Sequence, residues 1–278
     1  MSKFLISSFL STLIYFGTQA QQVRFPAPSP PQVIKQDFGL SSIEVSYSRP
    51  GVKGRQIFGD LIPYGKVWRT GANDATTISF GDDVIIDGKK IPAGKYGLLT
   101  IPGEREWTII FSKQLDVTNP ANYKQEEDLL RVNVSSQNLD FSIENLTFLF
   151  ANLTNASCDL QLIWDRTLVT LPIRSEIDSR IMAEIDMSMN QDNRPYYQSA
   201  MYYMENGKDL NKALAWFNKA TENNPKAYFM FYQKARCLAK MGNKKEAIAT
   251  AEKGIQLAKE ANNNDYISLN EKLIASLK

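Results

Sequence analysis

Hydrophobic and polar residues alternate along the first part of the chain. Polar residues separate Ile43, Val45 and Tyr47, and the apolar residues of 158–164 follow the same rule. A period of two is the pattern of a strand with one buried face. Strands are therefore expected at 43–47, 76–80, 84–86, 96–101, 107–111, 129–135, 143–152, 157–165 and 167–173.

Turn-forming residues separate several of these strands. Asp87-Gly88 follows 84–86 and favours a tight hairpin, because glycine accepts a positive φ. Pro102-Gly103 joins the next two strands, whereas 113–128 contains Asn119-Pro120 and is expected to form a loop or a short helix. Many short strands with turns between them predict an antiparallel β-sandwich or barrel over 37–174, and we favour the sandwich.

The first twenty residues have a pattern of their own. Lys3 precedes an apolar stretch at 4–16, and Thr18-Gln19-Ala20 is a small-residue cleavage pattern. This predicts a secretory signal peptide at 1–20, since the stretch is shorter than the ~20 apolar residues that span a bilayer. We expect cleavage near Ala20 and a mature chain, without a membrane span, in the periplasm or outside the cell.

Four prolines lie close together after the predicted cleavage site, at positions 26, 28, 30 and 31. Proline has no backbone N–H and fixes φ, so it disfavours helices and central strands. Residues 21–36 are therefore expected to form an extended leader and no regular element.

After Pro172 the spacing of apolar residues changes to that of a helix. Ile177, Ile181 and Ile185 lie four apart with Met189, which predicts a connecting helix over 173–189. Further helices are expected at 196–205, 210–222, 227–241, 245–260 and 266–277. The predicted fold class is a multi-domain chain, β then α, with an antiparallel β-sandwich followed by an α-helical hairpin module at 175–278.

Small residues recur within this helical part. Gly207 and Gly242 lie 35 residues apart, and Ala213 and Ala247 lie 34 apart. Small residues at this period allow paired helices to pack closely, and the pattern at 195–260 resembles the tetratricopeptide repeat. Because two copies are fewer than the roughly three that usually form a stable array, we expect neighbouring helices or the sandwich to cover the exposed ends.

The repeat resemblance implies a groove lined by the first helix of each repeat. An aromatic and cationic groove suits an extended peptide or an acidic segment of a protein partner. The competing interpretation is that this face packs on the sandwich. The groove positions are Tyr197, Met201, Phe229, Tyr232, Arg236 and Lys240.

Charge is unevenly distributed, although the chain has 32 basic and 30 acidic residues. Segment 47–73 has five basic residues and one acidic residue, and 206–278 has 13 basic and 7 acidic residues. Residues 74–205, with 11 basic and 20 acidic residues, are acidic instead. The basic helical part raises the question of nucleic-acid binding, but the predicted export argues against it.

Segment 47–73 also combines its cations with glycines and aromatic residues. Cations beside exposed aromatics on a loop suit a polar or anionic ligand such as a carboxylate, phosphate or sugar. In the competing interpretation, which we favour, Tyr64 and Trp68 pin the loop to the sandwich and the charges pair with the acidic segment. The candidate ligand-binding residues are Arg49, Lys53, Arg55, Tyr64, Trp68, Arg69 and Asn73.

The composition excludes several kinds of catalytic site. The chain has no histidine, which removes Ser-His, Cys-His and His-metal chemistry. Two cysteines form neither a four-cysteine zinc site nor a CxxC pair, and no phosphate loop, G-x-S-x-G or S-x-x-K motif is present. We therefore expect no metal and no cofactor. Paired carboxylates stay open, and they give the alternative function of a hydrolase of envelope or dietary glycans.

The two cysteines, Cys158 and Cys237, fall in different predicted modules. Cys158 lies on an alternating strand and Cys237 in a helical apolar pattern. We expect two buried free thiols and no disulfide, despite the oxidising compartment.

Several motifs point to a family. Tyr-Ser-Arg-Pro at 47–50, Lys-Gly-Arg at 53–55, Trp-Arg-Thr-Gly-Ala-Asn at 68–73 and Pro-Ala-Gly-Lys-Tyr at 92–96 stand out. With them, about 33–175 resembles the exported family known as domain of unknown function number 2911, found mainly in Bacteroidota. The resemblance implies an exported β-rich domain, often followed by helical repeats, and brings no established activity. We predict a non-enzymatic binding protein in which the repeats dock a partner.

Overall fold

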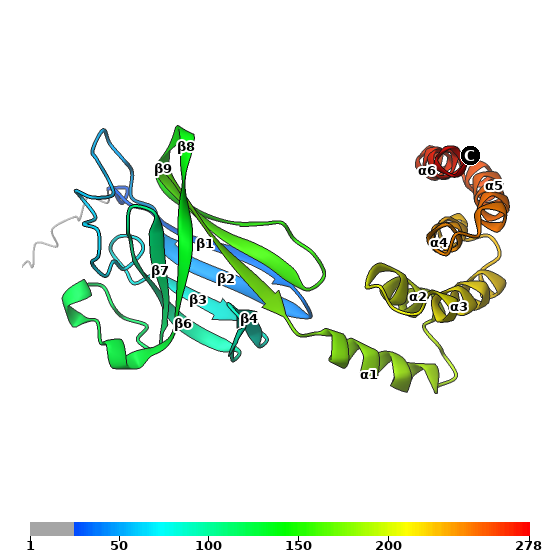
Figure 1. The fold of residues 1–278 in the computed structure, drawn as a ribbon, viewed down its shortest axis with the longest axis horizontal. Coiled ribbons are helices and arrows are strands. Elements are labelled where there is room, and N and C mark those ends of the chain that lie inside the picture. The colour runs from blue at the N-terminus through cyan, green and yellow to red at the C-terminus, as the bar shows by residue number, and fades with distance from the viewer. Residues whose placement is uncertain (1–24) are drawn as a thin grey trace, which may run out of the picture. The chain divides into compact units, whose positions relative to one another are not determined.

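The computed structural model describes residues 25–278, so the predicted signal peptide lies outside the described residues. The chain divides into two compact units after Glu176 (Figure 1). The first unit, called the β domain here, holds the strands, and the second, Ile177–Lys278, is called the helical module.

The β domain is built from antiparallel strands that form one sheet in the order β1-β2-β3-β6-β7-β8-β9-β4-β5. Asp87 and Gly88 both have positive φ, 50° and 71°, and form the tight turn predicted between β4 and β5. The predicted antiparallel strands are thus confirmed. Within the described residues they are β1 Pro31–Phe38, β2 Ser41–Ser48, β3 Thr77–Phe80, β4 Val84–Ile86, β5 Lys89–Ile91, β6 Gly94–Ile101, β7 Glu106–Ser112, β8 Asp128–Ala151 and β9 Ser157–Ser175.

The last two strands are longer than predicted. The separate strands expected at 129–135 and 143–152 are one strand, β8, and the two expected at 157–165 and 167–173 are one strand, β9. The pairing register between β8 and β9 shifts between Asn138 and Ile143 and again before Thr147. Such irregularities bend a strand pair without ending it, and the sequence pattern does not distinguish a bend from a break.

The bent sheet encloses one core, as the predicted sandwich requires. Phe148 of β8 packs edge to face on Tyr47 of β2, with ring centroids 4.8 Å apart, and its N–H donates to the Tyr47 hydroxyl. Trp164 of β9 stacks on Trp68 at 5.7 Å, and Trp107 of β7 lies 6.4 Å from Trp68. Side chains from both halves of the sheet therefore fill one interior.

The N-terminal leader is shorter than expected. Residues 31–36 were predicted to lie outside any regular element, but Pro31–Phe38 forms β1, which among the described strands pairs with β2 alone. The prediction was wrong because Pro31 is the first residue of an edge strand, where a missing N–H breaks no ladder bond. The segment predicted as a loop or short helix, 113–128, contains the 3-10 turns Pro120–Asn122 and Gln125–Glu127.

The helical module matches the predicted helices closely. The connecting helix, however, starts at Asp178 and not at 173, because Arg174 and Ser175 still pair with β4 as the end of β9. In the described part of the chain, no helix combines the length and the apolar character needed to cross a membrane. The helices are α1 Asp178–Met189, α2 Tyr196–Glu205, α3 Leu210–Asn223, α4 Tyr228–Lys240, α5 Lys244–Glu260 and α6 Asn264–Leu277.

Neighbouring helices cover both ends of the repeat pair. Ile185 of α1 is buried in the core of the first repeat, and Asp178 accepts a hydrogen bond from the Tyr202 hydroxyl at 2.8 Å. At the other end α6 packs on α5, where a Cβ added to Gly254 would lie 2.9 Å from the Asn270 Oδ1 atom. The small residue therefore permits this close approach, as the repeat pattern predicts.

Both cysteines are free and buried, which confirms the prediction of two unpaired thiols. Cys158 shares the buried face of β9 with Leu160, Leu162 and Trp164. Burial raises the pKa of each thiol to about 11, so both stay protonated at neutral pH.

Candidate functional site

Arg49, the first candidate ligand residue of segment 47–73, bonds to the β domain itself. Its Nε atom donates to the main-chain oxygen of Leu146 at 3.0 Å, and Nη2 donates to the Thr147 hydroxyl at 2.8 Å. Both acceptors belong to β8, so the guanidinium fastens the end of β2 to a distant strand. Such bonds to a charged donor are worth about 1.5–3 kcal/mol each.

Arg55 and Arg69 also donate to main-chain carbonyl groups. Arg55 bonds the oxygens of Val52 at 3.1 Å and Gly51 at 2.6 Å, which closes a tight local turn. Arg69 donates through Nη1 to the oxygen of Thr118, while its Nε atom is buried without a hydrogen-bond partner among the described residues. These contacts are with carbonyl oxygens and not with the carboxylates that the competing interpretation expects.

The two aromatic candidates differ in exposure. Trp68 is only 5% exposed and belongs to the core, and its indole N–H donates to the Gly71 oxygen at 3.1 Å. Tyr64 is 40% exposed and lies over Gly59, where an added Cβ would approach the tyrosine ring to 2.8 Å. Trp68 therefore pins the loop, and Tyr64 keeps one face in solvent.

Lys53 and Asn73 complete the set. The Lys53 side chain is exposed, and its backbone, with φ 49°, donates to a Glu144 carboxylate oxygen at 3.0 Å. The Asn73 amide donates to the Ser29 oxygen at 3.0 Å and ties the N-terminal leader to the loop. The structure thus gives most of the seven residues a structural contact, and ligand binding by the loop stays a prediction.

In the helical module, the predicted groove positions lie on α2 and α4. Tyr197 and Phe229 meet edge to face with centroids 5.6 Å apart, and Met201 packs against the core beside Tyr197. Tyr232 continues the row of rings towards α6, where it meets Tyr266 at 5.7 Å. All of these side chains are half-buried, so each offers part of its surface to solvent.

The two groove cations are already paired. Arg236 Nη1 lies 2.9 Å from Glu205 Oε1, and Lys240 Nζ lies 3.8 Å from the other oxygen of the same carboxylate. Arg236 also lies over the Tyr232 ring, 5.9 Å from its centroid. The predicted groove positions therefore present aromatic surface, and the Glu205 carboxylate offsets one of the two positive charges.

Three further residues of this surface were not predicted from the sequence, namely Glu205, Tyr228 and Tyr266. Tyr228 and Tyr266 lie 5.0 Å apart, and the Tyr228 hydroxyl accepts a bond from Asn263 at 3.1 Å. Tyr266 was detectable in the sequence, because it follows Tyr232 by 34 residues, which is one repeat period. Glu205 gave no such signal, because it lies on α2 and its partners Arg236 and Lys240 lie on α4, about 30 residues further along the chain.

Comparison with known proteins supports the division into two modules. Residues 29–173 match the family described as protein of unknown function (DUF2911), and residues 194–226 and 230–260 match the tetratricopeptide repeat. None of the curated proteins matches the chain. Among residues 25–278, no three acidic or cysteine side chains gather in a way that would hold a metal ion.

Two solved structures are similar to part of the chain. They are the crystal and the solution NMR structures of a tetratricopeptide repeat domain protein from Salinibacter ruber, each 21% identical to this chain. Each match covers 29% of this chain, with 89% of the crystallised chain and 81% of the NMR chain, at TM-scores of 0.28 and 0.27.

Proposed function

Since the chain belongs to the DUF2911 family, whose function is unknown, and carries tetratricopeptide repeats behind that domain, we propose that it is an exported interaction protein whose helical module binds a protein partner. Repeats of this kind generally mediate contacts between proteins. The observation that carries the proposal is the row of half-buried rings across α2, α4 and α6.

The chemistry of the row favours an extended peptide segment with apolar or aromatic side chains. Half-buried rings offer large contact area at little cost in side-chain entropy. An acidic segment is less well matched, because Arg236 and Lys240 already share the Glu205 carboxylate. The partner would be a protein of the periplasm or the cell exterior, in keeping with the predicted export.

The test is partner capture by the tagged full-length chain, cross-linked in its native envelope. We expect Tyr232→Ala and Arg236→Ala to lose a protein that the unchanged chain captures, because both remove groove surface. Lys253→Ala is the matched control, since Lys253 is exposed on α5 and, within residues 25–278, bonds only to Gln256 of its own helix, at 3.2 Å.

Folding is checked for each variant by circular dichroism and urea unfolding. Tyr232 packs on Tyr266, so some loss of stability is expected from its removal. Unchanged capture by folded groove variants would count against the groove. Equal loss in the Lys253→Ala control would show that capture does not depend on this surface.

A ligand role for segment 47–73 has narrower support. Lys53, Arg55, Tyr64 and Asn73 are exposed, but the side chains of Arg55 and Asn73, like that of Arg49, bond to main-chain oxygens of the protein. We propose a polar or anionic ligand only at Lys53 and Tyr64, whose exposed side chains have no such main-chain bond among the described residues. Calorimetric titration with phosphate and with acetate, comparing the unchanged chain with Lys53→Ala, tests it directly.

A further inference from the structure

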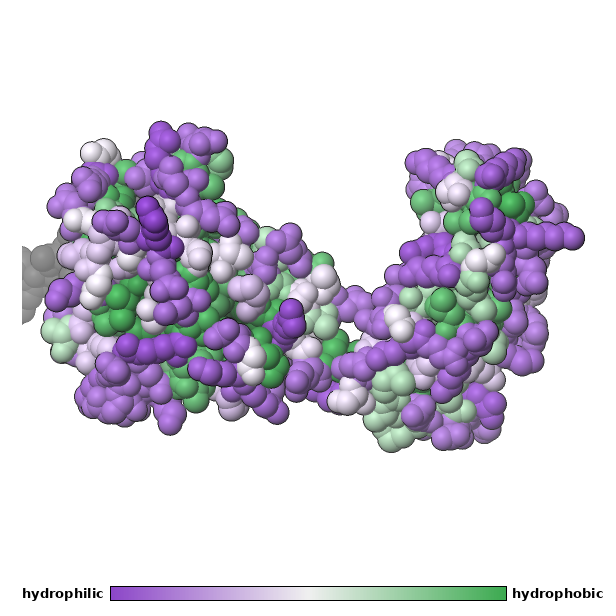
Figure 2. Space-filling view, viewed as in Figure 1, coloured by the Kyte–Doolittle hydropathy of each residue, from purple (hydrophilic) through white to green (hydrophobic). Residues whose placement is uncertain are grey.

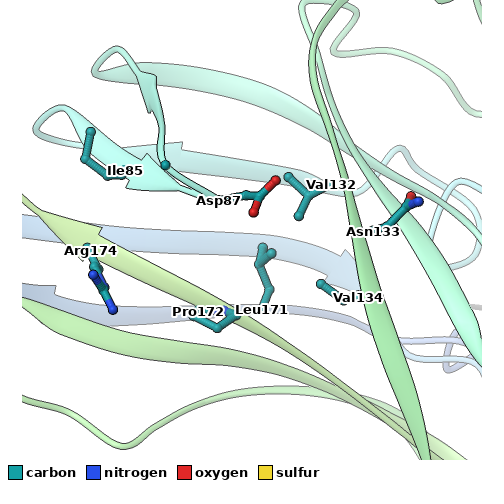
Figure 3. A pocket seen from close by; sticks show the side chains of 9 residues that line it. Ile85, Asp87, Val132, Asn133, Val134, Leu171, Pro172 and Arg174 are labelled. Atoms are coloured by element: carbon teal, nitrogen blue, oxygen red, sulfur yellow. The ribbon is translucent and has the colours of Figure 1, made fainter.

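The β domain has an opening in its sheet that segment 47–73 does not line. It holds about 340 Å³ and lies between β8, the end of β9 and the β4–β5 hairpin. Figure 2 shows apolar surface, in green, over this region of the β domain. Val132, Val134 and Leu171 line the opening, with Asp87 and Arg174 beside them (Figure 3).

The opening lies where β8 and β9 no longer pair with each other and β9 has not yet begun to pair with β4. β8 pairs with β9 only from Ser136, opposite Val169, onwards. β9 next pairs with β4, at Arg174 and Ser175. At residues 131–135, β8 pairs with β7 along one edge, and no described strand pairs with its other edge. The other edge of β8 therefore faces the opening.

The direction of the β8 backbone groups follows from one hydrogen bond. The Ser136 N–H donates to the Arg105 oxygen at 2.9 Å, which lies on the β7 side. In a strand, the N–H and C=O groups of successive residues point to opposite edges. Val134 and Val132 therefore bond towards β7, and the backbone groups of Asn133 point into the opening, as do those of 131 and 135.

The facing edge of β9 is arranged differently. The Ser175 N–H donates to the Ala156 oxygen at 2.9 Å. The backbone groups of the preceding residue, Arg174, therefore point to the other edge of β9, which is the edge that pairs with β4. Pro172 lies two residues before Arg174, so its backbone points to the same edge of β9, which faces the opening. Proline, however, has no N–H to donate there. Proline blunts a strand edge, so β8 and not β9 offers the continuous row of donors and acceptors.

We propose that the free edge of β8 at 131–135 binds an extended peptide as an added strand within this opening. An unpaired strand edge matches the backbone of a peptide in β conformation, which supplies the complementary donors and acceptors. Side chains on one face of the added strand would meet Val132, Val134 and Leu171, so apolar residues are required at alternate positions. Those on the other face would lie beside Asn133, which is exposed, and would be polar.

The test uses the full chain and a defined probe, the peptide acetyl-Lys-Thr-Val-Thr-Val-Thr-Lys-amide. Amide hydrogen exchange is followed by NMR with and without saturating peptide. We expect exchange of the Asn133 amide to slow about tenfold or more on binding, because the amide gains a partner. The amides of Val132 and Val134, already bonded to β7, are the internal control and stay protected in both states. An unchanged Asn133 amide, or no binding of the peptide, overturns the proposal.

A second arm separates strand pairing from contact by side chains alone. A peptide of the same sequence, methylated on alternate backbone nitrogens, keeps its side chains but loses its donors, and we expect it not to bind. Equal binding of the methylated peptide overturns the proposal. For the protein, Asn133→Pro removes the N–H that faces the opening, whereas Asn133→Ala keeps it. Loss of binding in the first variant only supports the proposal, and equal binding in both, with folding verified, contradicts it.

Discussion

The indole of Trp68 shows how one residue holds segment 47–73 in place. It stacks on Trp164 and meets Phe58 edge to face at 6.0 Å, and the Phe58 ring also lies 4.8 Å from Trp107. The four rings form one aromatic cluster in which Phe58, itself partly buried, packs against the core of the β domain. A residue read from sequence as a candidate ligand contact is therefore part of the core.

We expect Trp68→Ala to destabilise the β domain by about 3–5 kcal/mol, because a large buried ring leaves a cavity. Lys53→Ala is the matched change in the same segment and should stay within about 0.5 kcal/mol, since that side chain is exposed. Urea unfolding followed by tryptophan fluorescence measures both. Similar effects of the two substitutions would contradict the role assigned to Trp68.

Tyr123 gives the β domain a pH dependence in the alkaline range. Burial, together with the hydroxyl's bond to Asp128, raises the pKa of Tyr123 to about 12. A raised pKa in the folded state means that the contribution to stability is complete below pH 10 and is lost as the pH rises through 12.

We expect Tyr123→Phe to cost about 1.5–3 kcal/mol at pH 8, because it removes the hydroxyl's hydrogen bonds with two charged partners, Asp128 and Arg131. The difference from the unchanged chain should shrink between pH 10 and 12. Unfolding in urea at a series of pH values measures it, with Tyr64→Phe as the control at a more exposed tyrosine. A difference that stays constant up to pH 12 would contradict the assignment.

Side-chain partners were the part of the site that the sequence did not reveal. Arg49 bonds to Leu146 and Thr147, which lie 97 and 98 residues away, and no local pattern encodes such a pair. The Arg236 and Lys240 positions were found through the repeat period, but their shared partner Glu205 was not. Residue type and period predict where a side chain lies, and distant packing decides what it contacts.

At the scale of elements, the helices were predictable because their signal is local. The bounds of α2 agree with the expected 196–205, and those of α3 to α6 differ from expectation by one or two residues. The bend that joins two expected strands into β8 depends on pairing with β9, and β1 depends on the edge position of Pro31. These features follow from neighbours in space and so escaped the sequence pattern.

The covering helix α1 can be tested with two side chains that lie two residues apart. Ile185 is 7% exposed and packs in the core of the first repeat, whereas Met187 is 61% exposed. We expect Ile185→Ala to destabilise the helical module by about 2–5 kcal/mol and Met187→Ala to change it by less than about 0.5. Urea unfolding followed by circular dichroism at 222 nm measures both. Equal effects would show that α1 does not complete the repeat core.

At the scale of the whole molecule, the main cores of the two units differ in construction. The core of the β domain collects side chains from strands far apart in sequence, while that of the first repeat comes from α1 to α4. Each unit therefore has what an independently folding domain needs. The two proposed binding surfaces lie on different units, the β8 edge on the first and the ring row on the second.

We therefore expect fragments 25–176 and 177–278 to fold separately, each giving a dispersed NMR spectrum and a cooperative unfolding transition. The first fragment should bind the alternating peptide, and the second should retain the partner captured by the full chain. Because each fragment lacks the surface of the other, the two proposals can fail independently. A fragment that stays unfolded would show that its core needs the other unit. Peptide binding by 177–278 alone would place the strand-addition site on the wrong unit.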